Sequence, residues 1–239
     1  PECKLPKVWI TIWSENRFEK KGEVGVNLPN KLTVARICMI PLFMVFLLVP
    51  FSFGGEGEMV CRAVAAFLFL VAAITDHLDG KIARKRQLVT DFGKFLDPLA
   101  DKMMVLGALI GLIVLAGRGA STTEGDVYYR LTATLCFLIL FRELAVTSLR
   151  LAVSGSKGVV IAANILGKIK TVSQIVFVMV ALLEPIVFGE YLLGHFEVFL
   201  AVSQHHLLSY AAMLFTAVMT VWSGLSYFKA FFPLINSNK

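Results

Sequence analysis

Long apolar runs separated by short polar segments dominate the chain. Six runs of about 20 residues recur along it, at 33–52, 60–78, 97–117, 131–153, 159–183 and 206–228. An apolar helix of about that length crosses the ~30 Å hydrocarbon core of a bilayer, and it satisfies its own backbone hydrogen bonds there. The pattern therefore predicts an all-α integral membrane protein, a bundle of six transmembrane helices.

The composition argues against a soluble domain. The 239-residue chain is 57% hydrophobic and has a mean hydropathy of +0.74, whereas soluble domains are about 45–50% apolar. The cysteines show no CxxC or CxxH spacing, so we interpret them as small hydrophobic residues in helix packing. They are Cys3, Cys38, Cys61 and Cys136.

Basic residues are unevenly distributed between the apolar runs. Six Lys or Arg lie within 81–102 and three more within 157–170, whereas 51–61 and 184–204 contain none. Cytoplasmic loops of membrane proteins are enriched in Lys and Arg. We therefore expect the first two segments, and both termini, to lie in the cytoplasm.

The chain divides into three parts. Residues 1–26 mix Trp, Ile and Lys. They are expected to form an N-terminal juxtamembrane segment at the membrane surface, although a frayed or non-native terminus fits them equally well. Residues 27–232 are expected to form the six-helix domain, and 233–239 a C-terminal tail.

One polar stretch, DHLDGKIARKRQLVTDFGKFLDPLAD at 76–101, contains five acidic and five basic residues. Its acidic and small residues recur at helical spacing. One stripe comprises Asp76, Asp79, Gly80, Ala83 and Arg84, and a second comprises Thr90, Gly93, Asp97 and Asp101. The segment around 85–89 is expected to turn, so that two helices present four carboxylates to each other.

Four convergent carboxylates near a bilayer require compensating cations. Oxygen ligands at this density suit Mg²⁺, Mn²⁺ or Ca²⁺, and no Cys or His ligand set competes with them. Two metal ions bridged by a carboxylate are a common arrangement for displacement at phosphorus. Gly80 and Gly93 leave the helix surfaces bare for a phosphorylated ligand, and Arg84 can neutralise a phosphate. A solvated loop with incidental charges explains Lys81 and Asp91, but not the two stripes.

The spacing Asp76-x2-Asp79-Gly80-x2-Ala83-Arg84-x8-Gly93-x3-Asp97-x3-Asp101 resembles, without a gap or substitution, the signature of the CDP-alcohol phosphatidyltransferases. This resemblance implies a six-helix membrane enzyme, usually a homodimer, with two Mg²⁺ or Mn²⁺ ions per active site. Such enzymes use an alcohol to displace CMP from a CDP-linked lipid. The metal ligands implied are Asp76, Asp79, Asp97 and Asp101, and Asp101 is also the implied general base. The residues implied to bind the CDP-linked lipid are Asn30, Thr33, Gly80, Ala83, Arg84, Thr90 and Gly93.

Further segments resemble the bacterial phosphatidylglycerophosphate synthases within that family. They are NLPNKLTVARICMIPLF at 27–43, TDFGKFLDPLADK at 90–102, RELAVTSLR at 142–150 and GKIKT at 167–171. The resemblance covers about residues 27–230. It implies a bacterial cytoplasmic membrane protein that transfers the phosphatidyl group of CDP-diacylglycerol to sn-glycerol 3-phosphate and releases CMP.

Basic residues in two of these segments also favour an acceptor that bears a phosphate. Arg142 and Arg150 are eight positions apart on one predicted helix and share a face, and Glu143 can pair with a neighbouring cation. Lys168 and Lys170 lie near the beginning of the next helix. We expect these cations to lie beside the metal site and to hold the phosphate of glycerol 3-phosphate. The alternative is that these cations bind no ligand and only fix the orientation of the helices in the membrane.

Other functions stay open at this point. Within the same chemistry, the alternatives are a cardiolipin synthase of the CDP-alcohol type and an enzyme with an inositol phosphate acceptor. A divalent-cation transporter also has carboxylates in its spans. It would carry them near mid-membrane, with repeated or broken helices, and this pattern lacks both features. No nucleic-acid partner is expected.

Two smaller features concern packing. Gly107 and Gly111 form a small-xxx-small pair that predicts a helix contact, either within the bundle or at a dimer interface. Trp222, Tyr227 and the pair Phe231 and Phe232 are expected in an aromatic belt at the membrane surface.

Overall fold

The computed structural model describes residues 28–49, 57–86, 91–157, 165–189 and 197–236, and these ranges contain helices and turns but no strand. The helices are α2 (Leu28–Leu48), α3 (Gly57–Arg86), α4 (Asp91–Arg118), α5 (Thr123–Lys157), α6 (Ile165–Val187), α7 (Glu197–Gln204) and α8 (Leu207–Asn236). The predicted N-terminal segment 1–26 lies outside the described residues. The turn predicted at 85–89 is described only in its first two residues, which are the last residues of α3, and residues 87–89 lie outside the description.

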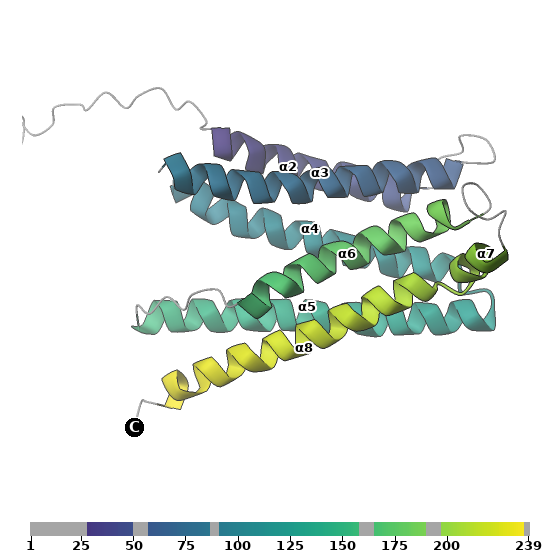
Figure 1. Ribbon diagram of the computed structural model, residues 1–239. Coiled ribbons are helices and arrows are strands. Elements are labelled where there is room, and N and C mark those ends of the chain that lie inside the picture. The colour runs from purple at the N-terminus through teal and green to yellow at the C-terminus, as the bar shows by residue number, and fades with distance from the viewer. Residues whose placement is uncertain (1–27, 50–56, 87–90, 158–164, 190–196, 237–239) are drawn as a thin grey trace, which may run out of the picture.

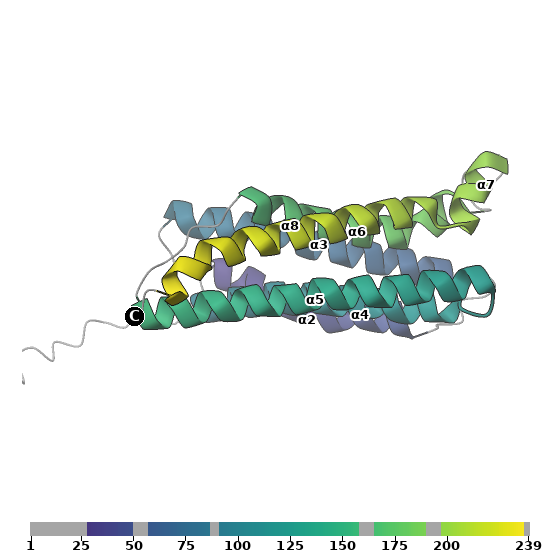
Figure 2. The same cartoon turned by 90° about the horizontal axis from the view of Figure 1, so that it is seen from below.

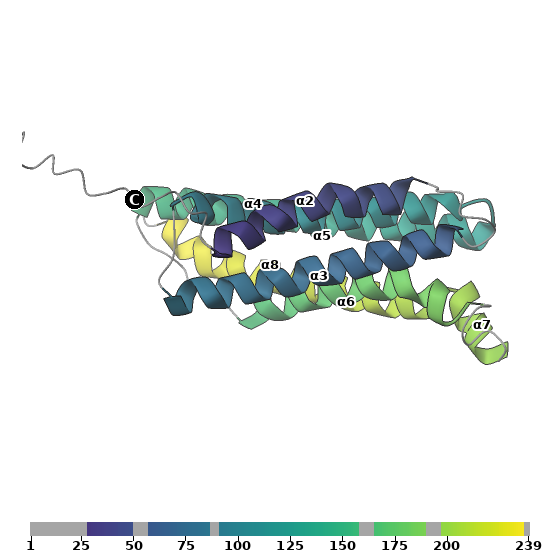
Figure 3. The ribbon, with the colours of Figure 1, turned by 90° about the horizontal axis from the view of Figure 1, so that it is seen from above.

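The six long helices pack in two rows, and in Figure 1 the row with α3, α6 and α8 lies in front of the row with α2, α4 and α5. Seen from below and from above, α2, α4 and α5 form one row, and α3, α6 and α8 form the other (Figures 2 and 3). Contacts of α2 with α3, and of α5 with α8, join the two rows. The core between them is aliphatic and aromatic, and within it the rings of Phe43 and Phe69 lie 5.8 Å apart.

The lengths of the helices confirm an all-helical membrane architecture. Five of the long helices contain segments long and apolar enough to cross a bilayer: Gly57–Asp76, Leu99–Arg118, Thr123–Arg150, Ile165–Val187 and Leu207–Ala230. The first predicted span corresponds to α2, whose apolar part, Leu32–Leu48, is shorter. It is near the ~17-residue lower limit for a span. Large apolar side chains such as Phe137, Phe215 and Trp222 are exposed, as expected for contact with lipid.

Gly107 and Gly111 pack within the bundle, which settles the choice that the sequence left open. A Cβ on Gly107 would lie 3.2 Å from the sulfur of Met44, and one on Gly111 would overlap the side chain of Leu47. Both neighbours belong to α2. The small pair therefore lets α4 approach α2 closely.

The charged stretch lies at one end of the bundle, which we call the motif end. The C-terminus of α3 and the N-terminus of α4 lie there, together with the N-terminus of α6 and the C-termini of α5 and α8 (Figure 1). The short helix α7, which the sequence pattern did not predict, lies at the opposite end. The chain therefore gathers both predicted sets of functional residues, acidic and basic, at one end.

Candidate active site

The two predicted stripes lie on two helices that contact each other and whose consecutive ends lie at the motif end. Helix α3 carries the first stripe, and α4 carries all of the second except Thr90, which is outside the described residues. Among the predicted metal ligands, Asp76 and Asp101 have described side chains, and both are about one-third to two-fifths exposed. The side chains of Asp79 and Asp97 are outside the description. Convergence of four carboxylates therefore stays a prediction.

Asp76 is held by a buried arginine that sequence reasoning did not assign to the site. Nη1 of Arg36 donates a hydrogen bond to Oδ1 of Asp76 over 2.6 Å. Arg36 lies on α2, and its side chain is 0% exposed. A fully buried guanidinium requires a carboxylate partner, so the Arg36–Asp76 pair fixes both the position of α2 and the orientation of the first motif aspartate.

The residues predicted for the CDP side are described only in part. Thr33 is buried, with 1% of its surface exposed, three positions before Arg36 on the same face of α2. The other six fall where no side chain is described: Asn30, Gly80, Ala83, Arg84, Thr90 and Gly93. Only Thr33 is therefore placed, and it lies beside the residue that holds Asp76.

A buried carboxylate, Glu143, organises the basic residues. Its two oxygens accept hydrogen bonds from the Nζ atoms of Lys102 and Lys170, and Nη1 of Arg142 lies 3.3 Å from Oε2. Nη2 of Arg142 also donates to Oγ of Ser223 over 2.7 Å. We call Lys102, Arg142, Glu143 and Lys170 the basic cluster. It joins α4, α5 and α6 through one carboxylate, and Ser223 adds α8.

The basic cluster reaches the acidic motif through α4. Nζ of Lys102 lies 3.7 Å from Oδ2 of Asp101 while it binds Glu143. Arg142 and Lys170, two of the four predicted acceptor-binding cations, are therefore linked to the predicted general base by one lysine. Sequence reasoning did not assign Lys102, although it directly follows Asp101.

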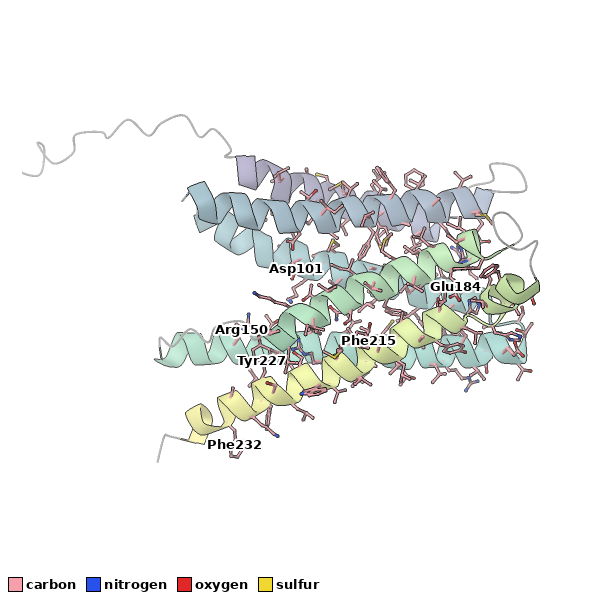
Figure 4. The ribbon with its side chains drawn as sticks, in the orientation of Figure 1. Asp101, Arg150, Glu184, Phe215, Tyr227 and Phe232 are labelled. Carbon is pink, nitrogen blue, oxygen red and sulfur yellow. The ribbon has the colours of Figure 1, made fainter. Side chains whose placement is uncertain are left out.

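Tyr227 completes the basic side of the site, and its assignment to an aromatic belt is wrong. Only 4% of its surface is exposed. Its ring faces the guanidinium groups of Arg142 and Arg150 at 5.7 and 5.5 Å, and its hydroxyl accepts a hydrogen bond from Nη2 of Arg150 over 3.3 Å. Figure 4 shows Arg150 and Tyr227 together, toward the motif end from Glu184. Trp222 and Phe232 are exposed, at 60% and 57%, and the side chain of Phe231 lies outside the described residues.

Two glycines allow this packing around Tyr227. A Cβ on Gly167 of α6 would lie 3.1 Å from the hydroxyl of Tyr227, and one on Gly224 of α8 would lie 3.3 Å from Cγ of Arg142. Larger residues would push α6 and α5 away from α8. Both glycines are thus part of the framework that brings the cations together.

Lys168 differs from the other predicted acceptor-binding cations. It is exposed near the beginning of α6, two positions from the buried Lys170. Positions two apart on a helix point to different sides. No hydrogen bond or ion pair within the described part of the chain joins Lys168 to the basic cluster, so its role stays a prediction.

The chain is similar in sequence to known proteins over most of its length. A sequence model described as CDP-alcohol phosphatidyltransferase matches residues 26–222. The chain is 47% identical over 167 residues to the CDP-diacylglycerol--glycerol-3-phosphate 3-phosphatidyltransferase of Bacillus subtilis (strain 168), covering 68% of this chain and 79% of that protein.

Two further relatives extend the similarity. Identity is 43% over 150 residues, 63% of either chain, to a probable phosphatidylglycerophosphate synthase of Mycobacterium tuberculosis (strain ATCC 25618 / H37Rv). It is 36% over 208 residues to the CDP-diacylglycerol--glycerol-3-phosphate 3-phosphatidyltransferase of Rickettsia bellii (strain RML369-C), covering 87% of this chain and 97% of that protein. Because the family model spans the acidic motif and the basic cluster, and relatives above 30% identity cover most of the chain, this chain belongs to the CDP-alcohol phosphatidyltransferase family.

Proposed function

We propose that this membrane protein transfers the phosphatidyl group of CDP-diacylglycerol to sn-glycerol 3-phosphate, giving phosphatidylglycerophosphate and CMP. The Bacillus and Rickettsia relatives are named for this activity. The observation that carries the proposal for this chain is the basic cluster beside Asp101. It supplies a binding site for an acceptor that bears its own phosphate.

The charge of the basic cluster suits a phosphate monoester. Lys102, Arg142 and Lys170 contribute three positive charges and Glu143 one negative charge, which leaves a surplus of two. A phosphate monoester carries about −1.5 to −2 at neutral pH. Arg150, held against Tyr227, adds a further cation near the cluster. Topology anchoring alone does not explain why Lys170 is buried, since an anchoring lysine keeps its charge in water.

The reaction assigned to the site is a direct displacement at phosphorus. The primary hydroxyl oxygen of glycerol 3-phosphate attacks the lipid-side phosphorus of CDP-diacylglycerol, and the bond from that phosphorus to the bridging oxygen breaks. CMP leaves with the bridging oxygen, and the hydroxyl proton passes to the carboxylate of Asp101. Lys102, 3.7 Å from that carboxylate, links the proton acceptor to the cations that hold the acceptor phosphate. A positioned general base commonly contributes about 10²–10⁴-fold in rate.

The proposal includes two Mg²⁺ or Mn²⁺ ions, held by Asp76, Asp79, Asp97 and Asp101. The described donors fit such ions, because Asp76 and Asp101 offer hard carboxylate oxygens on partly exposed side chains. When bound, the ions would neutralise charge on the diphosphate and on the departing phosphate. Arg36 keeps the carboxylate of Asp76 oriented within this set.

Orientation and assembly belong to the same proposal. We place the motif end in the cytoplasm, since the Lys- and Arg-rich segments lie there and glycerol 3-phosphate and the released CMP are water-soluble. We also propose a homodimer, in keeping with the family resemblance. Labelling of single exposed cysteines from either side of sealed vesicles would test the orientation. The mass of the protein in nanodiscs would test the homodimer.

An acceptor comparison tests the function. The purified protein, in detergent with CDP-diacylglycerol and Mg²⁺, should release CMP and form phosphatidylglycerophosphate when glycerol 3-phosphate is added. Phosphatidylglycerol and inositol phosphate serve as acceptor controls for the cardiolipin synthase and inositol phosphate alternatives. Faster CMP release with either control would reassign the acceptor within the same chemistry.

A further inference from the structure

A second polar site lies at the end of the bundle opposite the motif end. It is a cavity of about 250 Å³. Its floor is apolar and includes Leu112, Leu115 and Ala181, whereas Arg62, Arg118 and His206 line it with nitrogen donors. The reaction proposed above uses none of these residues.

The cavity lies at the level where the membrane spans end. One of its residues, Glu58, directly follows the first residue of the span Gly57–Asp76, and Arg118 is the last residue of Leu99–Arg118. His206 directly precedes Leu207–Ala230. Ends of spans coincide with the headgroup region of a bilayer. The cavity therefore opens among lipid headgroups, on the face of the membrane away from the motif.

The two guanidinium groups have donors to spare for a ligand. Arg62 donates to Glu58 over 2.8 Å, and Arg118 donates to the carbonyl of Leu48. A guanidinium has five N–H donors, and these hydrogen bonds occupy one donor on each arginine. Glu58 is 61% exposed, so its attraction for Arg62 is weakened by solvent. Together, Arg62, Arg118 and Glu58 leave one surplus positive charge in the cavity.

His206 is held in place beside the arginines by its neighbours. It has φ = 50°, a backbone conformation that residues other than glycine seldom adopt. Its ring stacks on Tyr128 with the centroids 4.3 Å apart. Behind it, the buried carboxylate of Glu184 accepts hydrogen bonds from the backbone N–H groups of Leu208 and Ser209, each over 2.9 Å. Figure 4 shows Glu184 at this end of the bundle. The wall containing His206 is thus built into the start of α8.

We propose that this cavity binds the phosphodiester of an anionic phospholipid in the leaflet away from the motif end. A phosphodiester carries one negative charge, which matches the one surplus positive charge of the cavity. Guanidinium groups bind phosphate oxygens through paired N–H donors, and the apolar floor suits the upper part of an acyl chain. Burial lowers the pKa of His206, so near neutral pH the ring is uncharged and one nitrogen still donates.

The test compares lipid binding by the full-length protein and its variants. Native mass spectrometry would follow titration with short-chain phosphatidylglycerol, with diacylglycerol of the same chains as the probe without phosphate, and with inorganic phosphate. Arg62→Gln/Arg118→Gln should weaken binding of one phosphatidylglycerol molecule by at least about tenfold. Arg130→Gln removes an exposed arginine at the same end, outside the cavity and paired with Asp126, and should leave lipid binding unchanged. CMP release should stay at the wild-type rate in both variants.

The remaining outcomes separate the proposal from its alternatives. If the double variant does not fold, Arg62→Gln alone and the charge-preserving Arg62→Lys provide the comparison. Arg62→Gln should weaken binding most, and Arg62→Lys, which keeps the charge but loses the paired N–H donors, should weaken it less. Equal affinity of wild type and Arg62→Gln/Arg118→Gln for phosphatidylglycerol would overturn the site. Equal affinity of the wild type for diacylglycerol and for phosphatidylglycerol would also overturn it. So would a loss of inorganic phosphate binding in Arg62→Gln/Arg118→Gln without any loss of phosphatidylglycerol binding. None of these results depends on which acceptor the active site uses.

Discussion

Glu143 and Lys170, 27 positions apart in the sequence, form a buried ion pair that joins α5 to α6. Lys170 is 3% exposed and Glu143 is 9% exposed. Removing two charges from water costs free energy, and only a close ion pair with further hydrogen bonds offsets that cost. Here the same carboxylate also binds Lys102, next to Asp101. One acidic residue thereby holds the basic side of the site against the acidic motif.

Replacing Glu143 with Ala should therefore affect stability and acceptor binding together. Lys170 would be left buried without its carboxylate, which costs about 3–5 kcal/mol. The KM for glycerol 3-phosphate should rise by about tenfold or more, since the cations would lose their common geometry. The KM for CDP-diacylglycerol should change little. Thermal unfolding in detergent and steady-state kinetics with each substrate varied are the measurements.

A matched control uses an acidic residue of the same helix. Asp126 of α5 pairs with Arg130 at the opposite end and is partly exposed. Asp126→Asn should change the unfolding midpoint and both KM values very little, because exposed helix pairs contribute about 0.3–0.5 kcal/mol. A Glu143→Ala protein as stable as Asp126→Asn, with wild-type KM for glycerol 3-phosphate, would show that Glu143 does not organise the site.

The acidic motif was predictable because it depends on local periodicity. Asp76 and Asp79 are one turn apart, as are Asp97 and Asp101, so helical spacing alone puts each pair on one face. The helices α3 and α4 then extend through the charged stretch as expected. The first span was the weaker prediction: its helix ends at Leu48, whereas the apolar run continues to 52.

The basic side was only partly predictable because it depends on packing between distant helices. Arg142 and Lys170 stood out as cations beside apolar runs. Tyr227 did not, because an aromatic residue near the end of a span is typical of a membrane-surface belt. Its burial arises from the close approach of α6 at Gly167. The sequence signal that could have indicated a partner of Asp76 is Arg36, a lone arginine within the first apolar run.

Tyr227 provides the second test, because its hydroxyl and its ring can be removed separately. Tyr227→Phe keeps the ring beside Arg142 and Arg150 and loses the hydrogen bond to Arg150, so kcat/KM for glycerol 3-phosphate should fall about two- to tenfold. Tyr227→Leu also removes the cation–π contacts and should fall further. Trp222→Leu, on the exposed side of the same helix, is the control and should keep wild-type kinetics. The assignment of Tyr227 to the site would fail if Tyr227→Leu and Trp222→Leu behaved alike.

Metal removal tests the acidic motif. Chelation should abolish CMP release, and Mg²⁺ or Mn²⁺ should restore it. Asp76→Asn and Asp97→Asn should each lose nearly all turnover while the protein still folds. Asp91→Asn, in the same segment but off both stripes, should retain activity. A wild-type rate for Asp97→Asn would argue against two bound ions.

Glu184 should matter for stability and not for catalysis. Its carboxylate accepts the N–H groups of Leu208 and Ser209 and the hydroxyl of Ser209, so it caps the beginning of α8 from another helix. Glu184→Ala should lower the free energy of unfolding by at least about 2 kcal/mol. Glu124→Gln, exposed at the same end, is the control for unfolding. A loss of turnover in Glu184→Ala at a temperature where it is folded would contradict a purely structural role.

The most direct test of the central claim is CMP release from CDP-diacylglycerol with glycerol 3-phosphate or with glycerol as the acceptor. Both acceptors offer a primary hydroxyl, and only the first offers a phosphate for the basic cluster. For the wild type, kcat/KM should favour glycerol 3-phosphate by at least about a hundredfold, because several charge-assisted hydrogen bonds are lost with glycerol. In Arg142→Gln/Arg150→Gln the preference should shrink, chiefly through slower reaction with glycerol 3-phosphate. Equal kcat/KM for the two acceptors in the wild type would contradict the account.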